Sequence, residues 1–185
     1  MRNPHRFNKW IQRGLDHLNG TDKNLVVGGS RLLGAPHLLN CYLLTNEKTI
    51  DIELAPMFTV HEEFLVSVFA QAVNEALGWR ALPAAVSLDY QARLLAQRLP
   101  DLDEYTIIIR NADFGRLLIE ELQTLRHTPR LILEATTPGL VNVKRALHLD
   151  PTELLLRSEE AAEIANSWGG RAARDWRRVY SLSGG

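Results

Sequence analysis

Glycines at a fixed spacing mark residues 26–40, VVGGSRLLGAPHLLN, as the first stretch whose residue types could do chemistry. Two valines lead into a pair of glycines, and four residues separate Gly29 from Gly34. A strand, a loop of this pattern and a helix form a cradle for phosphate, whose full signature is G-x-x-x-x-G-K-[ST]. Here the lysine and hydroxyl positions are Ala35 and Pro36. The stretch predicts a strand–loop–helix unit and leaves open whether an anion binds there.

Arg110 is the most unusual charged residue, because it ends the apolar run YTIIIR. A charge at the end of a buried strand must be solvated or paired. We expect a salt bridge from Arg110 to Asp113, Glu134 or Glu53, each of which should lie near the same end of a sheet. The alternative is a phosphate contact that replaces the missing lysine.

Two carboxylates alternate with apolar residues in the segment TIDIELA. Alternation places Asp51 and Glu53 on one face of a strand, opposite the isoleucines and leucine. We expect this to be a solvated face at a sheet edge or a strand end. A second hypothesis is a small-molecule enzyme on a doubly wound fold, in which Asp51 and Glu53 converge with Arg110 and Asp113 in an apolar pocket.

The elements that must position these residues follow from hydrophobic periodicity. Strands are expected at 25–27, 48–55, 105–110, 130–136 and 153–157. Helices are expected at 6–19, 36–44, 59–77, 88–98, 114–126, 140–148, 158–168 and 171–180. This alternation predicts an α/β, three-layer sandwich with a mainly parallel sheet. Ligands of such sheets bind at the carboxyl ends of the strands, where VVGGS, IIIRNAD and LILEATT terminate.

The order of these segments resembles that of a known family over residues 10–168. LVVGGSRLLGAP, YTIIIRNAD, RLILEATTPGL and LLLRSEEAAEIA follow one another as in the ATPase domain of maltose-regulator-like (LuxR-family) bacterial transcription activators. Those activators belong to the STAND class of signal-transduction P-loop NTPases. The resemblance implies a P-loop strand, a Walker B strand, a sensor strand and a helix near the end of the core.

The catalytic positions that the resemblance implies are altered together. Ala35 stands for the P-loop lysine, Pro36 for the hydroxyl residue and Arg110 for the Walker B aspartate, and the sensor segment Thr136-Thr137 lacks an arginine. The lysine, the hydroxyl and the acid together neutralise the transferring phosphoryl group, which is most of this catalysis. We therefore predict no catalytic residues, no cofactor and no ATP hydrolysis by the usual route.

The function predicted from these changes is that of a pseudo-ATPase, a regulatory or interaction domain that belongs to a transcriptional regulator. The alternative is a switch that binds ATP or ADP with little or no hydrolysis, because loop N–H groups and a helix N-terminus hold phosphate without lysine. Its degenerate phosphate site would comprise Gly29, Ser30, Arg31, Gly34 and Arg110.

The remaining features narrow the partners. The 185 residues carry a net charge of −1 and one cysteine, which fit a cytoplasmic protein and give no global attraction to nucleic acid. No apolar run is long enough for a membrane span, and six scattered histidines support no metal site. We expect a protein partner or other domains of a longer regulator.

Two units are expected along the chain: a domain at 1–168, and a basic helix and tail at 169–185. Arg171, Arg174 and Arg178 share one helical face, which would mark a DNA-binding adaptor. Because the chain has no net positive charge and no recognition motif, contact with DNA is not expected.

Overall fold

The computed structural model describes most of the chain. The described residues are 9–28, 34–55, 63–78, 90, 97, 102–123, 129–137 and 141–183. The helix expected at 88–98 and the first residues of that expected at 59–77 fall largely outside these ranges. Within the described residues, no helix has the length and apolar character that crossing a bilayer requires.

A five-stranded sheet forms the middle of the molecule. Its strands are β1 (Leu25–Gly28), β2 (Thr49–Glu53), β3 (Thr106–Arg110), β4 (Arg130–Ala135) and β5 (Leu147–Leu149). Their spatial order is β2-β3-β4-β1-β5, and every neighbouring pair is parallel. All carboxyl ends therefore lie at one edge of the sheet, as the sequence predicted.

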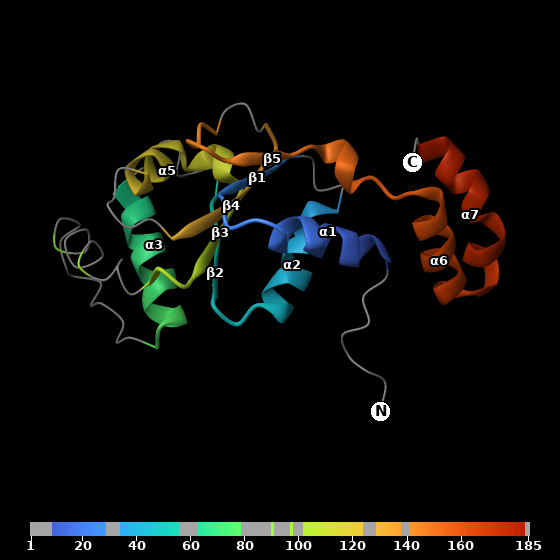
Figure 1. The fold of residues 1–185 in the computed structure, drawn as a ribbon, viewed down its shortest axis with the longest axis horizontal. Helices are drawn as coiled ribbons and strands as arrows, with labels where there is room; N and C mark the ends of the chain where they lie inside the picture. The colour runs from blue at the N-terminus through green and yellow to red at the C-terminus, as the bar shows by residue number, and fades with distance from the viewer. Residues whose placement is uncertain are drawn as a thin grey trace.

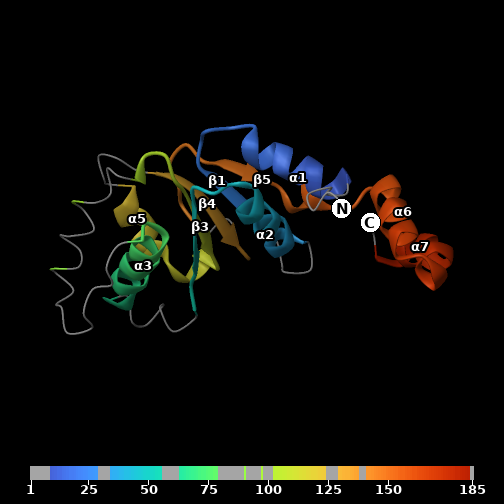
Figure 2. The same cartoon turned by 90° about the horizontal axis from the view of Figure 1, so that it is seen from below.

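Helices cover both faces of this sheet, so the predicted three-layer α/β sandwich is confirmed (Figures 1 and 2). On one face lie α1 (Lys9–Asn19) and α2 (Ala35–Thr45), and on the other lie α3 (Glu63–Ala76) and α5 (Arg116–Leu122). Two short 3₁₀ helices, η4 (Ala112–Phe114) and η6 (Pro151–Leu154), follow β3 and β5.

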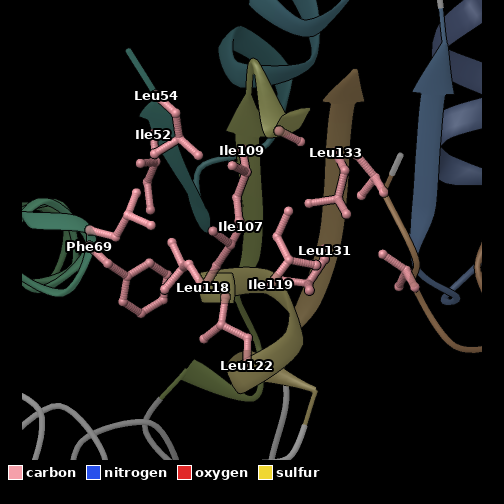
Figure 3. Packing of buried hydrophobic residues seen from close by; sticks show 14 of the residues in the cluster. Ile52, Leu54, Phe69, Ile107, Ile109, Leu118, Ile119, Leu122, Leu131 and Leu133 are labelled. Carbon is pink, nitrogen blue, oxygen red and sulfur yellow. The ribbon is translucent and has the colours of Figure 1, made fainter. Parts of the chain in front are cut away.

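The core beneath α3 and α5 is aliphatic (Figure 3). Alternate residues of β2, β3 and β4 point into it and meet Phe69 of α3 and Ile119 of α5. Gly115 precedes α5 and lies so close to Leu54 that a Cβ there would overlap the leucine side chain.

The core beneath α1 and α2 uses the other face of the same strands. Ile108 and Ile132 lie in it with Leu25 and Val27 of β1. Gly14 of α1 lets the two helices approach, because a Cβ at this position would lie 2.6 Å from Leu38 Cδ1.

A helical hairpin of α6 (Ser158–Trp168) and α7 (Gly170–Ser183) stands beside the sandwich (Figures 1 and 2). Gly169 and Gly170 make the turn with positive φ angles of 67° and 58°. Among the described side chains of these two helices, only Glu160 and Ala165 are buried. The hairpin therefore contacts the sandwich mainly at its base, which is the first turn of α6 and the residues just before it.

Two predictions for the segment after β4 were wrong. The helix expected at 140–148 is instead an irregular stretch followed by β5, whose Leu147 N–H donates to the Asn24 carbonyl at 2.9 Å. The strand expected at 153–157 contains the end of η6, which starts where the Asp150 side chain accepts from Thr152 N–H at 2.7 Å. Pairing with β1 makes residues 147–149 a strand, and the Asp150 cap starts the 3₁₀ helix in place of the expected strand.

The helix expected at 114–126 is correct in part. The chain after β3 first makes η4, and α5 begins only at Arg116. Asn111 causes the break, because its left-handed conformation, with φ of 53°, redirects the chain at the end of β3.

Candidate functional site

The glycine segment leads from β1 to α2, as the phosphate-loop pattern predicted. Gly29, Ser30 and Arg31 lie outside the described residues, so their part in the predicted phosphate site stays a prediction. Gly34 is the N-cap of α2 and has a left-handed backbone, with φ of 78°. The Trp10 indole lies against it, because a Cβ on Gly34 would be 2.6 Å from Trp10 Cη2. Both the conformation and this contact require glycine.

The first turn of α2 lacks the groups that a phosphate loop supplies at this point. Ala35 is fully buried in the core between α1, α2 and the sheet. Pro36 occupies the first turn and has no N–H to donate. The first backbone bond of the helix runs from Leu38 N–H to the Gly34 carbonyl at 3.0 Å. The helix therefore starts with fewer donors for an anion than an ordinary helix N-terminus.

Arg110 occupies the position at which the resemblance places a metal-binding aspartate. Its Nε donates to Asp51 Oδ1 at 2.8 Å and Oδ2 at 3.1 Å, and its Nη2 donates to Asn40 Oδ1 at 2.7 Å. The Arg110 side chain is 11% exposed and the Asp51 side chain is 34% exposed. Two of the three guanidinium nitrogens thus bind protein oxygens.

The predicted salt-bridge partners of Arg110 were wrong. It pairs with Asp51 rather than with Asp113, Glu134 or Glu53. In the parallel register Arg110 lies beside Glu53, and Asp51 is two residues earlier on the same face of β2. The guanidinium reaches back along the sheet edge to Asp51, and Asn40 of α2 binds its other side.

Asp113 has a structural task. Its Oδ2 accepts from Thr136 N–H at 2.7 Å, and its Oδ1 accepts from Thr137 N–H at 3.0 Å. The carboxylate thereby ties the turn after β3 to the residues that follow β4. The second hypothesis placed Asp113 with Arg110 in one pocket, but its oxygens face the backbone after β4.

Asn111 is a residue of this edge that the sequence prediction missed. Its side-chain amide donates to the Leu54 carbonyl at 3.0 Å and joins the ends of β2 and β3. Asparagine directly after an apolar strand is a recognisable signal for a left-handed turn. That signal would have identified this residue.

A cavity of about 170 Å³ lies at this edge and is lined by Pro36, Glu53, Arg110, Asn111 and Glu134. Glu134 is buried, with 7% of its surface exposed. Asp51 and Glu53 are exposed on β2, which is the end strand of the sheet, so the predicted edge position is confirmed. The charged side chains that line this cavity are the Arg110 guanidinium and the carboxylates of Glu53 and Glu134, and Asp51 is paired with Arg110.

Other candidate chemistry finds little support among the described residues. Their histidines, cysteine and carboxylates form no group that could hold a metal ion. Cys41 is buried in α2, and burial raises the pKa of its thiol, which keeps it protonated and unreactive. Arg171 on α7 is paired with Asp175 at 3.5 Å.

Comparison with known proteins agrees with the fold. No protein-family model matches the chain, and no curated protein matches it. The solved structure of a Walker-type ATPase from Pyrococcus abyssi is similar, with a TM-score of 0.58 and 13% sequence identity. The match covers 94% of this chain and 62% of that chain, so this chain spans less than two thirds of that ATPase.

The α/β fold with its five-stranded parallel sheet therefore matches that of a Walker-type, or P-loop, ATPase. The sequence resemblance to a P-loop ATPase domain is confirmed at the level of the fold.

Proposed function

We propose that this chain is a catalytically inactive, P-loop-like domain with a regulatory or protein-interaction role in the cytoplasm. Arg110 is the observation that carries the proposal. It stands at the end of β3, where a Walker-type ATPase needs an acid to organise Mg²⁺, and it is bound to Asp51 and Asn40. A guanidinium at this point repels the metal instead of binding it.

The local charge also disfavours a nucleotide. The charged side chains that line the cavity are the carboxylates of Glu53 and Glu134 and the Arg110 guanidinium, which is paired with Asp51. A triphosphate brought to this cavity would meet the carboxylates of Glu53 and Glu134. Pro36 removes a backbone donor at the same place.

The size of the cavity points the same way. Pockets that bind small molecules typically hold roughly 300–1,000 Å³. The cavity among the described residues at this edge holds about 170 Å³. By itself this volume suits a water cluster or a small group, and the loop at 29–33 that would complete a nucleotide site lies outside the described residues.

The role left for such a domain is that of a rigid platform. The parallel sheet carries a hydrophobic core on each face, and these cores hold the helices and the sheet in one body. The exposed Trp168, with 78% of its surface accessible, offers an anchor of the kind that protein interfaces use. From its resemblance to STAND-class activators, we place the domain in a signal-transduction or transcription-regulating protein.

Thermal unfolding with nucleotides tests this proposal. The chain is heated alone and with millimolar ATP or ADP, with and without Mg²⁺, and phosphate release is measured in parallel. Saturation at about 100 times Kd adds about 2.7 kcal/mol, which is a shift of several degrees. We expect no shift and no release of phosphate.

Two other outcomes separate the alternatives. A shift without phosphate release, abolished by Arg110→Ala, would show a nucleotide-binding switch that uses Arg110 for charge. Catalytic release of phosphate would overturn the proposal.

A further inference from the structure

We propose that α1 is a mechanical link between the start of α2 and the C-terminal hairpin. Trp10 contacts the Gly34 end of α2, and Arg13 fixes the base of the hairpin. A change of backbone conformation at Gly34 would then move α6 and α7, and a partner bound to the hairpin would move Gly34. The link does not depend on whether a nucleotide binds.

Trp10 joins three segments that are distant in sequence. Its ring is nearly parallel to that of His37 in α2, with centroids 6.2 Å apart and an interplanar angle of 5°. It also lies against the Gly34 backbone. Its indole N–H donates to the Leu154 carbonyl in η6 at 2.6 Å. Because the indole is buried, it cannot shift at one end without disturbing the other.

Arg13 makes the second half of the link. Its Nε and Nη2 each donate to one oxygen of Glu160, both at 2.8 Å, in a two-pronged pair. The same guanidinium donates to the carbonyls of Glu153 and Leu155, which lead into α6. Glu160 is also held by the Arg157 N–H, at 2.7 Å. Such a planar fork fixes one relative orientation of α1 and α6.

The hairpin is built to move as one body. The Tyr180 hydroxyl near the end of α7 donates to the Leu156 carbonyl before α6, at 2.9 Å. The two helices contact each other along their length, and Figure 1 shows them side by side and apart from the sheet. A displacement at the base would therefore carry both helices with it.

Trp10 and Arg13 lie three residues apart on one helix, about 4.5 Å along its axis. A displacement of Trp10 is thus passed to Arg13 through a single turn of α1. Coupling of this kind is reciprocal, so its effect can be measured from either end.

Amide hydrogen exchange of the full chain tests the link. In Gly34→Ala the new Cβ overlaps the Trp10 indole, and alanine is strained in the left-handed conformation of this position. We expect faster exchange in α6 and α7, on the order of tenfold, with β3 and β4 unchanged. Gly115→Ala is the matched control, because its Cβ overlaps Leu54 on the opposite face of the sheet. It should leave α6 and α7 at their original rates.

The link also predicts non-additivity. Trp10→Phe keeps an aromatic ring but removes the N–H bond to Leu154. In this background we expect Gly34→Ala to add little to the exchange of α6 and α7. Full additivity of the two changes, or an equal effect of Gly115→Ala on the hairpin, would overturn the proposal.

The reverse measurement covers the case in which Gly34→Ala does not fold. Glu160→Gln weakens the fork at the hairpin, far from α2. We expect faster exchange of the Leu38 amide, whose partner is the Gly34 carbonyl. An unchanged Leu38 amide beside a loosened hairpin would show that α1 anchors the hairpin without coupling it to α2.

Discussion

Two arginine–carboxylate pairs can be compared in this molecule. One joins the sandwich to the C-terminal hairpin, and the other lies at the candidate site. Arg13 and Glu160 are 147 residues apart in sequence and join the body to the hairpin. Arg110 and Asp51 lie on neighbouring strands and close the carboxyl edge of the sheet. Both pairs are well formed, with 2.8 Å contacts.

The pairs differ in what surrounds them. The Arg13 and Glu160 side chains are 18% and 6% exposed, and three other backbone groups complete their hydrogen bonds. Arg110 is 11% exposed, so it is at least as buried as Arg13, but its partner Asp51 is 34% exposed at a sheet edge. An ion pair contributes more to stability when both of its charges are buried and further hydrogen bonds complete them. We therefore expect the Arg13–Glu160 pair to contribute more than the Arg110–Asp51 pair. The Arg110 pair matters mainly for the charge that it places in the site.

Arg13→Met should have the largest effect. The substitution leaves the Glu160 carboxylate buried without its cation, which costs about 3 kcal/mol. Urea denaturation should show this loss as a lower unfolding midpoint with a similar slope. Arg116→Met is the control, because Arg116 is 70% exposed and forms a helical surface pair with Glu120. It should leave the midpoint unchanged.

Lowering the pH should reduce the difference in unfolding free energy between the wild type and Arg13→Met. Burial alone would raise the pKa of Glu160, but hydrogen bonds from Arg13 and the Arg157 N–H outweigh burial and hold the pKa below its ordinary value. The pair's contribution is therefore complete above a pH of about 4.3 and is lost as the pH falls through the lower, folded-state pKa. Unfolding midpoints measured across this window should converge. A constant gap down to a pH of about 2 would mean that Arg13 acts through packing rather than charge.

These regions also differ in how far the sequence could predict them. Four of the five strands were predicted, three from short runs of isoleucine, leucine and valine and the fourth, Thr49–Glu53, from alternation of apolar and polar residues. The fifth, Leu147–Leu149, is only three residues long, and its pairing with β1 makes it a strand. No local pattern carries that information.

The sequence predicted where the site lies and that Arg110 belongs to it, but it did not predict which residues Arg110 contacts. Its position at the carboxyl edge followed from the parallel sheet, and Arg110 was singled out by its place after three isoleucines. The register of β2 against β3 places Arg110 beside Glu53, yet its guanidinium binds Asp51 and Asn40 of α2, an arrangement that only the assembled fold supplies. The Arg13–Glu160 pair has no sequence signal, since its residues belong to opposite ends of the chain.

Asp113→Ala should have an intermediate effect on stability. It removes the acceptor for two N–H groups after β4, and these groups are partly open to water, so the cost is about 1–2 kcal/mol. Thermal unfolding measures the loss. Asp113→Asn keeps one acceptor oxygen and should recover about half of it. A loss equal to that of Arg13→Met would place the architectural role at the sheet edge as well.

Arg110→Ala should have the smallest effect on stability, about 0.5–1 kcal/mol, because its partner Asp51 is partly solvated and regains water when the arginine is removed. Its effect on charge is larger, since it removes the guanidinium that is paired with Asp51 and that lines the cavity with Glu53 and Glu134. Arg110→Lys keeps the charge but loses the contact to both Asp51 oxygens and to Asn40. Measuring the stability of both variants in low and high salt separates the contribution of the charge from that of the hydrogen-bond geometry. A salt-sensitive loss in the alanine variant, absent in the lysine variant, would show that Arg110 acts by balancing charge, whereas equal losses would show that its geometry is what matters.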